Sequence, residues 1–96
     1  MKIGFPFLIY MFYTYIIFSA SSNRYYVGSS QDVGERLRRH NVNHSKSTKG
    51  KGPWLLVKSF EFETRSEAIL LERKIKKRGA KRFLEGLEFG FSDLDE

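Results

Sequence analysis

Five side chains in this sequence carry chemical groups that could act together at a phosphodiester bond. They are Tyr15, Tyr26, Arg36, His40 and Glu72. A carboxylate can hold Mg²⁺, and an arginine can neutralise phosphate oxygens through two parallel hydrogen bonds. A tyrosine whose pKa is lowered by neighbouring cations can take a proton from water. Taken together, these residue types predict chemistry at a phosphate.

The spacing of these residues would bring some of them together on helix faces. Arg36 and His40 are four residues apart, and Glu72 stands four residues before Lys76, so each pair would lie one helical turn apart. Simpler interpretations exist for each residue. The tyrosines could be ordinary strand aromatics, Arg36 a surface charge, and Glu72 the partner of Lys76 in a surface ion pair. Which interpretation holds depends on where the strands and helices place these side chains.

Two strands are expected to carry the tyrosines. Aromatic and β-branched residues from Phe12 to Ser19 predict a first strand, and Arg24 to Gly28 predict a second. The polar segment Ala20 to Asn23 between them is typical of a turn. Tyr15 and Tyr26 are therefore expected on paired strands of a hairpin.

A helix is expected to carry the arginine and the histidine. Asp32, followed three residues later by Glu35, resembles a capping box that opens a helix ending near Asn41. Its apolar residues predict which side is buried. Val33 and Leu37 would form that side, with Arg36, Arg39 and His40 toward the other side.

The second half of the chain predicts a strand and two helices after an exposed basic loop at residues 42–53. Trp54 to Phe62 has strand character, with Trp54 in the core. A Thr-x-x-Glu capping box opens a helix over Thr64 to Lys77, which Gly79 would end, and Ala80 to Leu87 predicts a short helix. The order ββαβαα predicts an α+β fold with a small three-stranded, antiparallel-type sheet flanked by helices.

Charge and composition narrow the class of protein. The 96 residues suffice for one domain with one core, and residues 24–82 hold 16 Lys/Arg against 6 Asp/Glu. This basic surplus is spread over several elements, which favours a nucleic-acid partner over a membrane surface. The absence of cysteine excludes disulfides and cysteine-based zinc sites and fits a reducing compartment, so we expect a cytoplasmic protein.

The two ends of the chain differ from its basic body. The uncharged run Ile3 to Phe18 has the length of a signal-peptide core, so export or a membrane segment is an alternative. Its tyrosines and Pro6 favour a strand instead, and we expect no membrane association. We interpret residues 1–10 as an extension added by a start upstream of Met11, residues 11–87 as the domain, and residues 88–96 as an acidic tail.

The stretch from Tyr13 to Lys77 resembles a GIY-YIG nuclease domain, most closely that of the small stand-alone bacterial members. It is also similar to the N-terminal domain of the excision-repair incision nuclease. The second half of the family signature is YVG at residues 26–28, whereas YTY at residues 13–15 keeps only the final tyrosine of the first half. ERLRRH matches the helix motif, STKGKGPW matches the loop before the third strand, and SEAILLERKIK places Glu72 at the metal-binding glutamate.

The resemblance implies a role for each of these residues. Glu72 would bind one divalent ion, Mg²⁺ or another such as Mn²⁺, and Arg36 would stabilise charge on the phosphate. Tyr15 and Tyr26, assisted by His40, would position and deprotonate the attacking water, and the sequence leaves open which tyrosine is the base. The residues expected to contact DNA phosphates are Arg39, Lys46, Lys49, Lys51 and Lys76.

The sequence departs from the family pattern in two places. The first motif lacks its Gly-Ile pair, and no asparagine follows Asn43, although many members carry a late one that supports the site. Lys76 would take the place of that asparagine. The resemblance implies a DNA endonuclease, in repair or in processing of branched or single-stranded DNA. No appended recognition domain is expected, so a protein partner could supply specificity. The alternative is a binding module that keeps the fold without catalysis.

Overall fold

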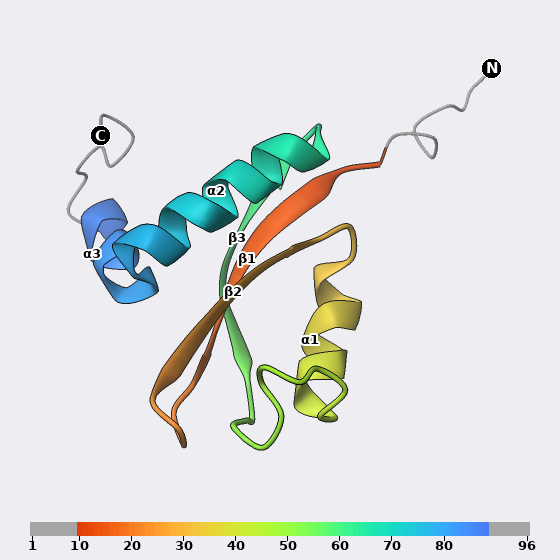
Figure 1. Ribbon diagram of the computed structural model, residues 1–96, viewed down its shortest axis with the longest axis vertical. Coiled ribbons are helices and arrows are strands. Elements are labelled where there is room, and N and C mark those ends of the chain that lie inside the picture. Colours follow the sequence, from red (N-terminus) through yellow and green to blue (C-terminus); the bar gives the residue numbers. More distant parts are fainter. Residues whose placement is uncertain (1–9, 89–96) are drawn as a thin grey trace.

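The computed structural model describes residues 10–88 and confirms the predicted α+β fold (Figure 1). Its elements are β1 (Phe12–Ser19), β2 (Arg24–Ser30), α1 (Val33–Asn41), β3 (Leu55–Phe62), α2 (Arg65–Arg78) and α3 (Ala80–Glu88). The order ββαβαα is as predicted, and β2 runs two residues beyond its expected end. Apart from Tyr10 and Glu88, the predicted N-terminal extension and acidic tail lie outside the described residues.

The sheet has the order β2-β1-β3, and β1 pairs antiparallel with both neighbours. The residues from Thr14 to Ile17 at its centre are all fully buried. A strand covered on both faces needs a continuous apolar run, which explains Tyr15 to Ile17, whereas the buried hydroxyl of Thr14 donates to the Ala68 carbonyl at 2.6 Å. β3 is an edge strand, and its apolar start, Leu55 to Val57, stays exposed.

Helices cover both faces of the sheet, with α1 on one side and α2 and α3 on the other (Figure 1). The core under α1 consists of Tyr15, Ile17 and Trp54, packed against by Tyr26, Val33 and Leu37. The core under α2 and α3 consists of Ile16, Val27, Ile75 and Phe83. Alternation along β1 therefore sends Tyr15 and Ile17 to one helix layer and Ile16 to the other.

Local hydrogen bonds begin and end the helices where the sequence predicts. The Asp32 side chain accepts from the backbone N–H of Glu35 at 3.0 Å to open α1. A complete capping box between Thr64 and Glu67 opens α2. Gly79, with φ of +98°, ends α2 and lets α3 begin at once.

The loop at residues 42–54 is anchored to the body of the protein. Asn41 Nδ2 donates to the Trp54 carbonyl at 3.0 Å, and the Trp54 N–H donates to Asn41 Oδ1 at 2.6 Å. Ser21 and Ser22, in the turn between β1 and β2, donate to the carbonyls of Gly52 and Lys51. Trp54 is 2% exposed, which confirms that it belongs to the core.

The apolar run near the N-terminus forms the central strand from Phe12 onward. The alternative of an apolar membrane helix therefore fails for that part of the run. Across residues 10–88 the structure contains no helix with the length and hydropathy needed to cross a bilayer.

Gly28 determines where the side chain of Tyr15 can lie. The two residues are direct partners across β1 and β2, so their side-chain positions share one face of the sheet. A Cβ atom at Gly28 would stand 2.6 Å from the Tyr15 hydroxyl oxygen and 2.8 Å from the adjoining ring carbon. The phenol therefore lies across the backbone of β2, in the space that any other residue would fill.

We expect Gly28→Ala to displace Tyr15 and to lower the free energy of unfolding by about 1–3 kcal/mol, the usual cost of overpacking. Gly34→Ala is the matched control, because a Cβ there meets nothing closer than 3.6 Å and alanine favours a helix. Urea unfolding measures both variants. Equal stability of Gly28→Ala and the wild type would show that Tyr15 does not need this space.

Candidate active site

Three predicted site residues form an aromatic cluster between the hairpin and α1. The ring of Tyr26 lies 4.8 Å from that of His40, measured between centroids, and the ring of Tyr15 lies 5.9 Å from His40 and 6.4 Å from Tyr26. The strand pairing explains this arrangement. Tyr15 pairs with Gly28 and Ile17 pairs with Tyr26, so both tyrosines face α1.

His40 is fully buried, which corrects the prediction that it points away from the packed side of its helix. Positions 33, 37 and 40 follow the i, i+4, i+7 spacing of a single helix face, so His40 continues the side formed by Val33 and Leu37. The structure places its ring against two tyrosines rather than in solvent.

Both ring nitrogens of His40 are hydrogen-bonded. Nε2 lies 2.9 Å from the Tyr15 hydroxyl, and Nδ1 lies 2.8 Å from Thr48 Oγ1. Thr48 Oγ1 also lies 3.5 Å from the Ser45 carbonyl, which can only accept. If the Thr48 hydroxyl donates to that carbonyl, it accepts from Nδ1–H, and Nε2 then accepts from Tyr15. We assign this tautomer from the hydrogen-bond network.

Burial keeps both partners of the Tyr15–His40 hydrogen bond neutral. Desolvation lowers the pKa of His40, and the charge of Arg36 lowers it further. Desolvation raises the pKa of Tyr15 to about 12, although Arg36 acts in the opposite direction. The expectation of a tyrosine with a lowered pKa is therefore wrong for Tyr15, because the cost of burying a phenolate exceeds the benefit of the nearby cation.

The two tyrosines differ in access to solvent. Tyr15 is fully buried, whereas Tyr26 is partly exposed. Arg36, on α1, is also partly exposed, and its charge acts on both Tyr15 and His40. Tyr26 and Arg36 are thus the members of this group that a ligand in solution can reach.

Glu72 belongs to the other helix layer and contacts the edge strand β2. Its Oε1 accepts from Ser29 Oγ at 2.9 Å, and its Oε2 accepts from Lys76 Nζ at 2.7 Å. Ser29 follows Gly28 on the edge strand β2 and points to the opposite face, toward α2. The carboxylate nevertheless raises the pKa of Tyr15 by Coulomb repulsion of the phenolate.

Glu72 fits one divalent metal ion in combination with a substrate. Within residues 10–88 no three His, Cys, Asp or Glu side chains lie together as a metal cluster. Mg²⁺ at phosphate sites is commonly held by one or two carboxylates with phosphate oxygens and water completing the shell. The 18% exposed side chain of Glu72 can supply that carboxylate, and Lys76, 53% exposed, can release it because half-exposed ion pairs are weak.

The predicted phosphate-contacting residues lie in three places. Arg39 bonds to Glu35, whose pKa is lowered to about 2 chiefly by its hydrogen bond to Arg38. Lys46, Lys49 and Lys51 lie in the loop at residues 42–54, which Thr48 joins to His40. Lys76 lies beside Glu72, as the simple ion-pair interpretation also predicted.

Three residues of the site had no assigned role in the sequence analysis. Thr48 orients His40, Ser29 holds Glu72, and Gly28 makes room for Tyr15. Gly28 and Thr48 both lie inside motifs that resemble the family, YVG and STKGKGPW, which was the available signal. Nothing in the local sequence pointed to Ser29.

The chain is similar to known proteins in sequence and in fold. The family model described as the GIY-YIG catalytic domain matches residues 11–85. A UPF0213 protein of Haloquadratum walsbyi is 40% identical over 65 residues, covering 67% of this chain and 72% of that protein. A UPF0213 protein of Listeria innocua is 37% identical over 68 residues, covering 70% and 76%. The solution NMR structure of a UPF0213 protein from Bacillus halodurans has a TM-score of 0.51 and 25% identity, covering 88% of this chain and 89% of that one.

Thr48→Val should change the tautomer of His40, because it removes the oxygen that accepts from Nδ1–H. In either tautomer Nδ1 is left as a buried polar atom without a partner, which costs about 1–3 kcal/mol, so the free energy of unfolding should fall by that amount. Thr48→Ser keeps the hydroxyl and is the control. Ring ¹⁵N chemical shifts of His40 measure the tautomer. An unchanged tautomer and stability in Thr48→Val would contradict the assignment.

His40 should make the fold less stable in mild acid. Its pKa is lower in the folded state than the ordinary 6.5, so the unfolded chain binds more protons below that pH. The free energy of unfolding should therefore be largest above pH 6.5 and fall as the pH falls through the folded-state pKa. The rings of Tyr15 and Tyr26 pack near that of His40, and the charge of Arg36 acts in the same direction as burial. Urea unfolding from pH 7.5 to about 5 should show a flatter dependence in His40→Gln than in the control His44→Gln.

Proposed function

We propose that this chain, which belongs to the GIY-YIG family, is a metal-dependent endonuclease that hydrolyses DNA phosphodiester bonds at one active site. The observation that carries the proposal is the convergence at the β2 edge. Tyr15, Tyr26, Arg36 and His40 approach it from one face of the sheet, and Glu72 approaches it from the other. A phosphate at this edge could meet groups from both layers.

Glu72 would hold the divalent ion. A bound Mg²⁺ or Mn²⁺ would supply Lewis-acid polarisation of a phosphoryl oxygen. Ser29 holds Oε1 of the carboxylate, and Oε2 is paired with Lys76. Oε2 would therefore exchange Lys76 for the metal ion. Lys76 Nζ, once released, could move to a phosphate oxygen on the same side of α2.

Arg36 and Tyr26 would act directly on the substrate because both are partly exposed. The guanidinium of Arg36 would neutralise charge that develops on the phosphate oxygens. Tyr26 would act as the base after its hydroxyl has released its own proton to solvent. The phenolate oxygen would then orient the attacking water and take a proton from it. The buried rings of Tyr15 and neutral His40 would keep the ring of Tyr26 in place, since both pack near it.

DNA is the substrate we propose, in repair or in processing of branched or single-stranded forms. Lys46, Lys49 and Lys51 would bind phosphates flanking the cleaved bond, together with Arg39 and Lys76. Such contacts position a duplex without reading its sequence. A protein partner would then supply any sequence or structure specificity.

A cleavage assay tests the proposal on supercoiled plasmid, flapped duplex and single-stranded DNA, each with Mg²⁺ or with EDTA. We expect nicking only with metal. Glu72→Gln should slow it by about 100-fold or more, because metal stabilisation of the transition state contributes several kcal/mol. Tyr26→Phe should slow it on the order of 10²- to 10⁴-fold, the usual contribution of a proton-transfer group.

Matched variants separate these effects from general damage. Glu85→Gln removes an exposed carboxylate on α3, and Tyr25→Phe alters the neighbouring tyrosine, whose ring packs on Phe18 at 4.6 Å. Both should nick like the wild type. Nicking that persists in EDTA or in Glu72→Gln would refute metal-dependent cleavage at Glu72. Binding without cleavage on all three substrates would instead support the non-catalytic module.

A further inference from the structure

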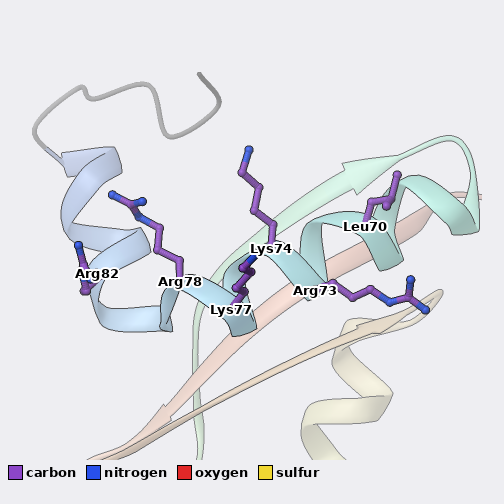
Figure 2. A pocket seen from close by; sticks show the side chains of 6 residues that line it. All are labelled: Leu70, Arg73, Lys74, Lys77, Arg78 and Arg82. Carbon is purple, nitrogen blue, oxygen red and sulfur yellow. The ribbon is translucent and has the colours of Figure 1, made fainter. Parts of the chain in front are cut away.

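A second basic surface lies between α2 and α3, apart from the basic loop. It is an open depression of about 660 Å³ lined by Leu70 and five cationic side chains. These are Arg73, Lys74, Lys77, Arg78 and Arg82. Figure 2 shows them coming from both helices, which meet at Gly79. The lining contains no acidic residue.

In the part of the chain that the structure describes, four of these five cations are not balanced by an acidic partner. Arg73 and Lys77 lie one turn apart on α2, and like charges at this spacing weaken a helix. Within residues 10–88, no carboxylate forms an ion pair with Arg73, Lys74, Lys77 or Arg82. A concave surface whose charged side chains are all cationic is suited to an anionic partner that presents several charges at once.

The cations connect the depression to the candidate active site. Successive residues of an α-helix are rotated by about 100° around its axis. Going around α2 from the position of Glu72, the next positions are therefore those of Lys76, Arg73 and Lys77. Lys76 already contacts Glu72, and Arg73 and Lys77 line the depression. A polyanion that has one phosphate at the metal ion proposed for Glu72 could therefore extend over Lys76, Arg73 and Lys77 and stay on basic surface.

We propose that the depression binds the phosphate backbone of duplex DNA on one side of the cleaved bond. This inference rests on the proposed function for the position of the scissile phosphate at Glu72. It adds Arg73, Lys74, Lys77 and Arg82 to the DNA-binding residues and makes α2 the element that joins the two sites. The duplex would then lie over the helix layer as well as over the edge of β2.

Binding measured in EDTA tests the proposal without requiring cleavage. A labelled duplex of about 20 base pairs, roughly 70 Å long, exceeds the 49 Å length of the protein. Fluorescence anisotropy at several salt concentrations gives the slope of log affinity against log salt. Lys77→Gln/Arg82→Gln removes one cation from each helix and should flatten that slope by about 1.8, twice the value of about 0.9 per phosphate contact.

The control variant Arg24→Gln/Lys58→Gln removes the same charge from exposed positions on β2 and β3. It should keep a slope close to that of the wild type, and circular dichroism checks the fold of both variants. Equal slopes for the two variants would overturn the proposal. Binding to vesicles of anionic lipid is measured for the same variants. If the depression variant keeps the wild-type slope on DNA but no longer binds the vesicles, the proposal is also overturned, and the surface is assigned to membranes. If the protein never nicks DNA but shows the predicted slopes, the proposed function is refuted, whereas DNA binding by the depression is still supported.

Discussion

The close approach of the Tyr15 phenol to the backbone of Gly28 is the constraint on which the site depends. The phenol occupies the space of a missing side chain, so its hydroxyl reaches His40 Nε2 at 2.9 Å. His40 in turn holds Thr48, and Thr48 belongs to the loop that carries three basic residues. A change at Gly28 would therefore pass through two hydrogen bonds into the basic loop. The next residue of β2, Ser29, donates a hydrogen bond to Glu72 on the other face of the sheet.

Burial and charge are divided between different parts of the site. Tyr15, His40 and Thr48 are fully buried, and each polar group among them has a partner, so the chain of hydrogen bonds is stable only in its neutral form. The charged groups Arg36 and Glu72 lie nearer the surface, where hydration reduces the cost of ionisation. The buried chain thus provides rigidity, and the partly exposed groups are those that can meet a phosphate.

The edge strand β2 has candidate site residues from both helix layers beside it. A central strand has a neighbouring strand on each side, and these neighbours keep the two faces of the sheet apart. An edge strand has a free side, around which side chains from the two faces can approach each other. Ser29 and Gly28, adjacent in sequence, serve opposite faces because side chains alternate along a strand. One holds Glu72 and the other accommodates Tyr15. The helix that carries Glu72, α2, also carries most of the cations that line the α2–α3 depression.

The sequence by itself determined the order of elements, the helix starts at Asp32 and Thr64, and the burial of Trp54. These features follow from local patterns of capping residues, strand aromatics and apolar spacing, which act over a few residues. Only the tertiary structure decided that His40 is buried, that the pKa of Tyr15 is raised, and that Glu72 approaches from the opposite face. Each of these depends on which surfaces pack together, because desolvation and the path of a side chain around a sheet edge arise from contacts between residues far apart in the chain.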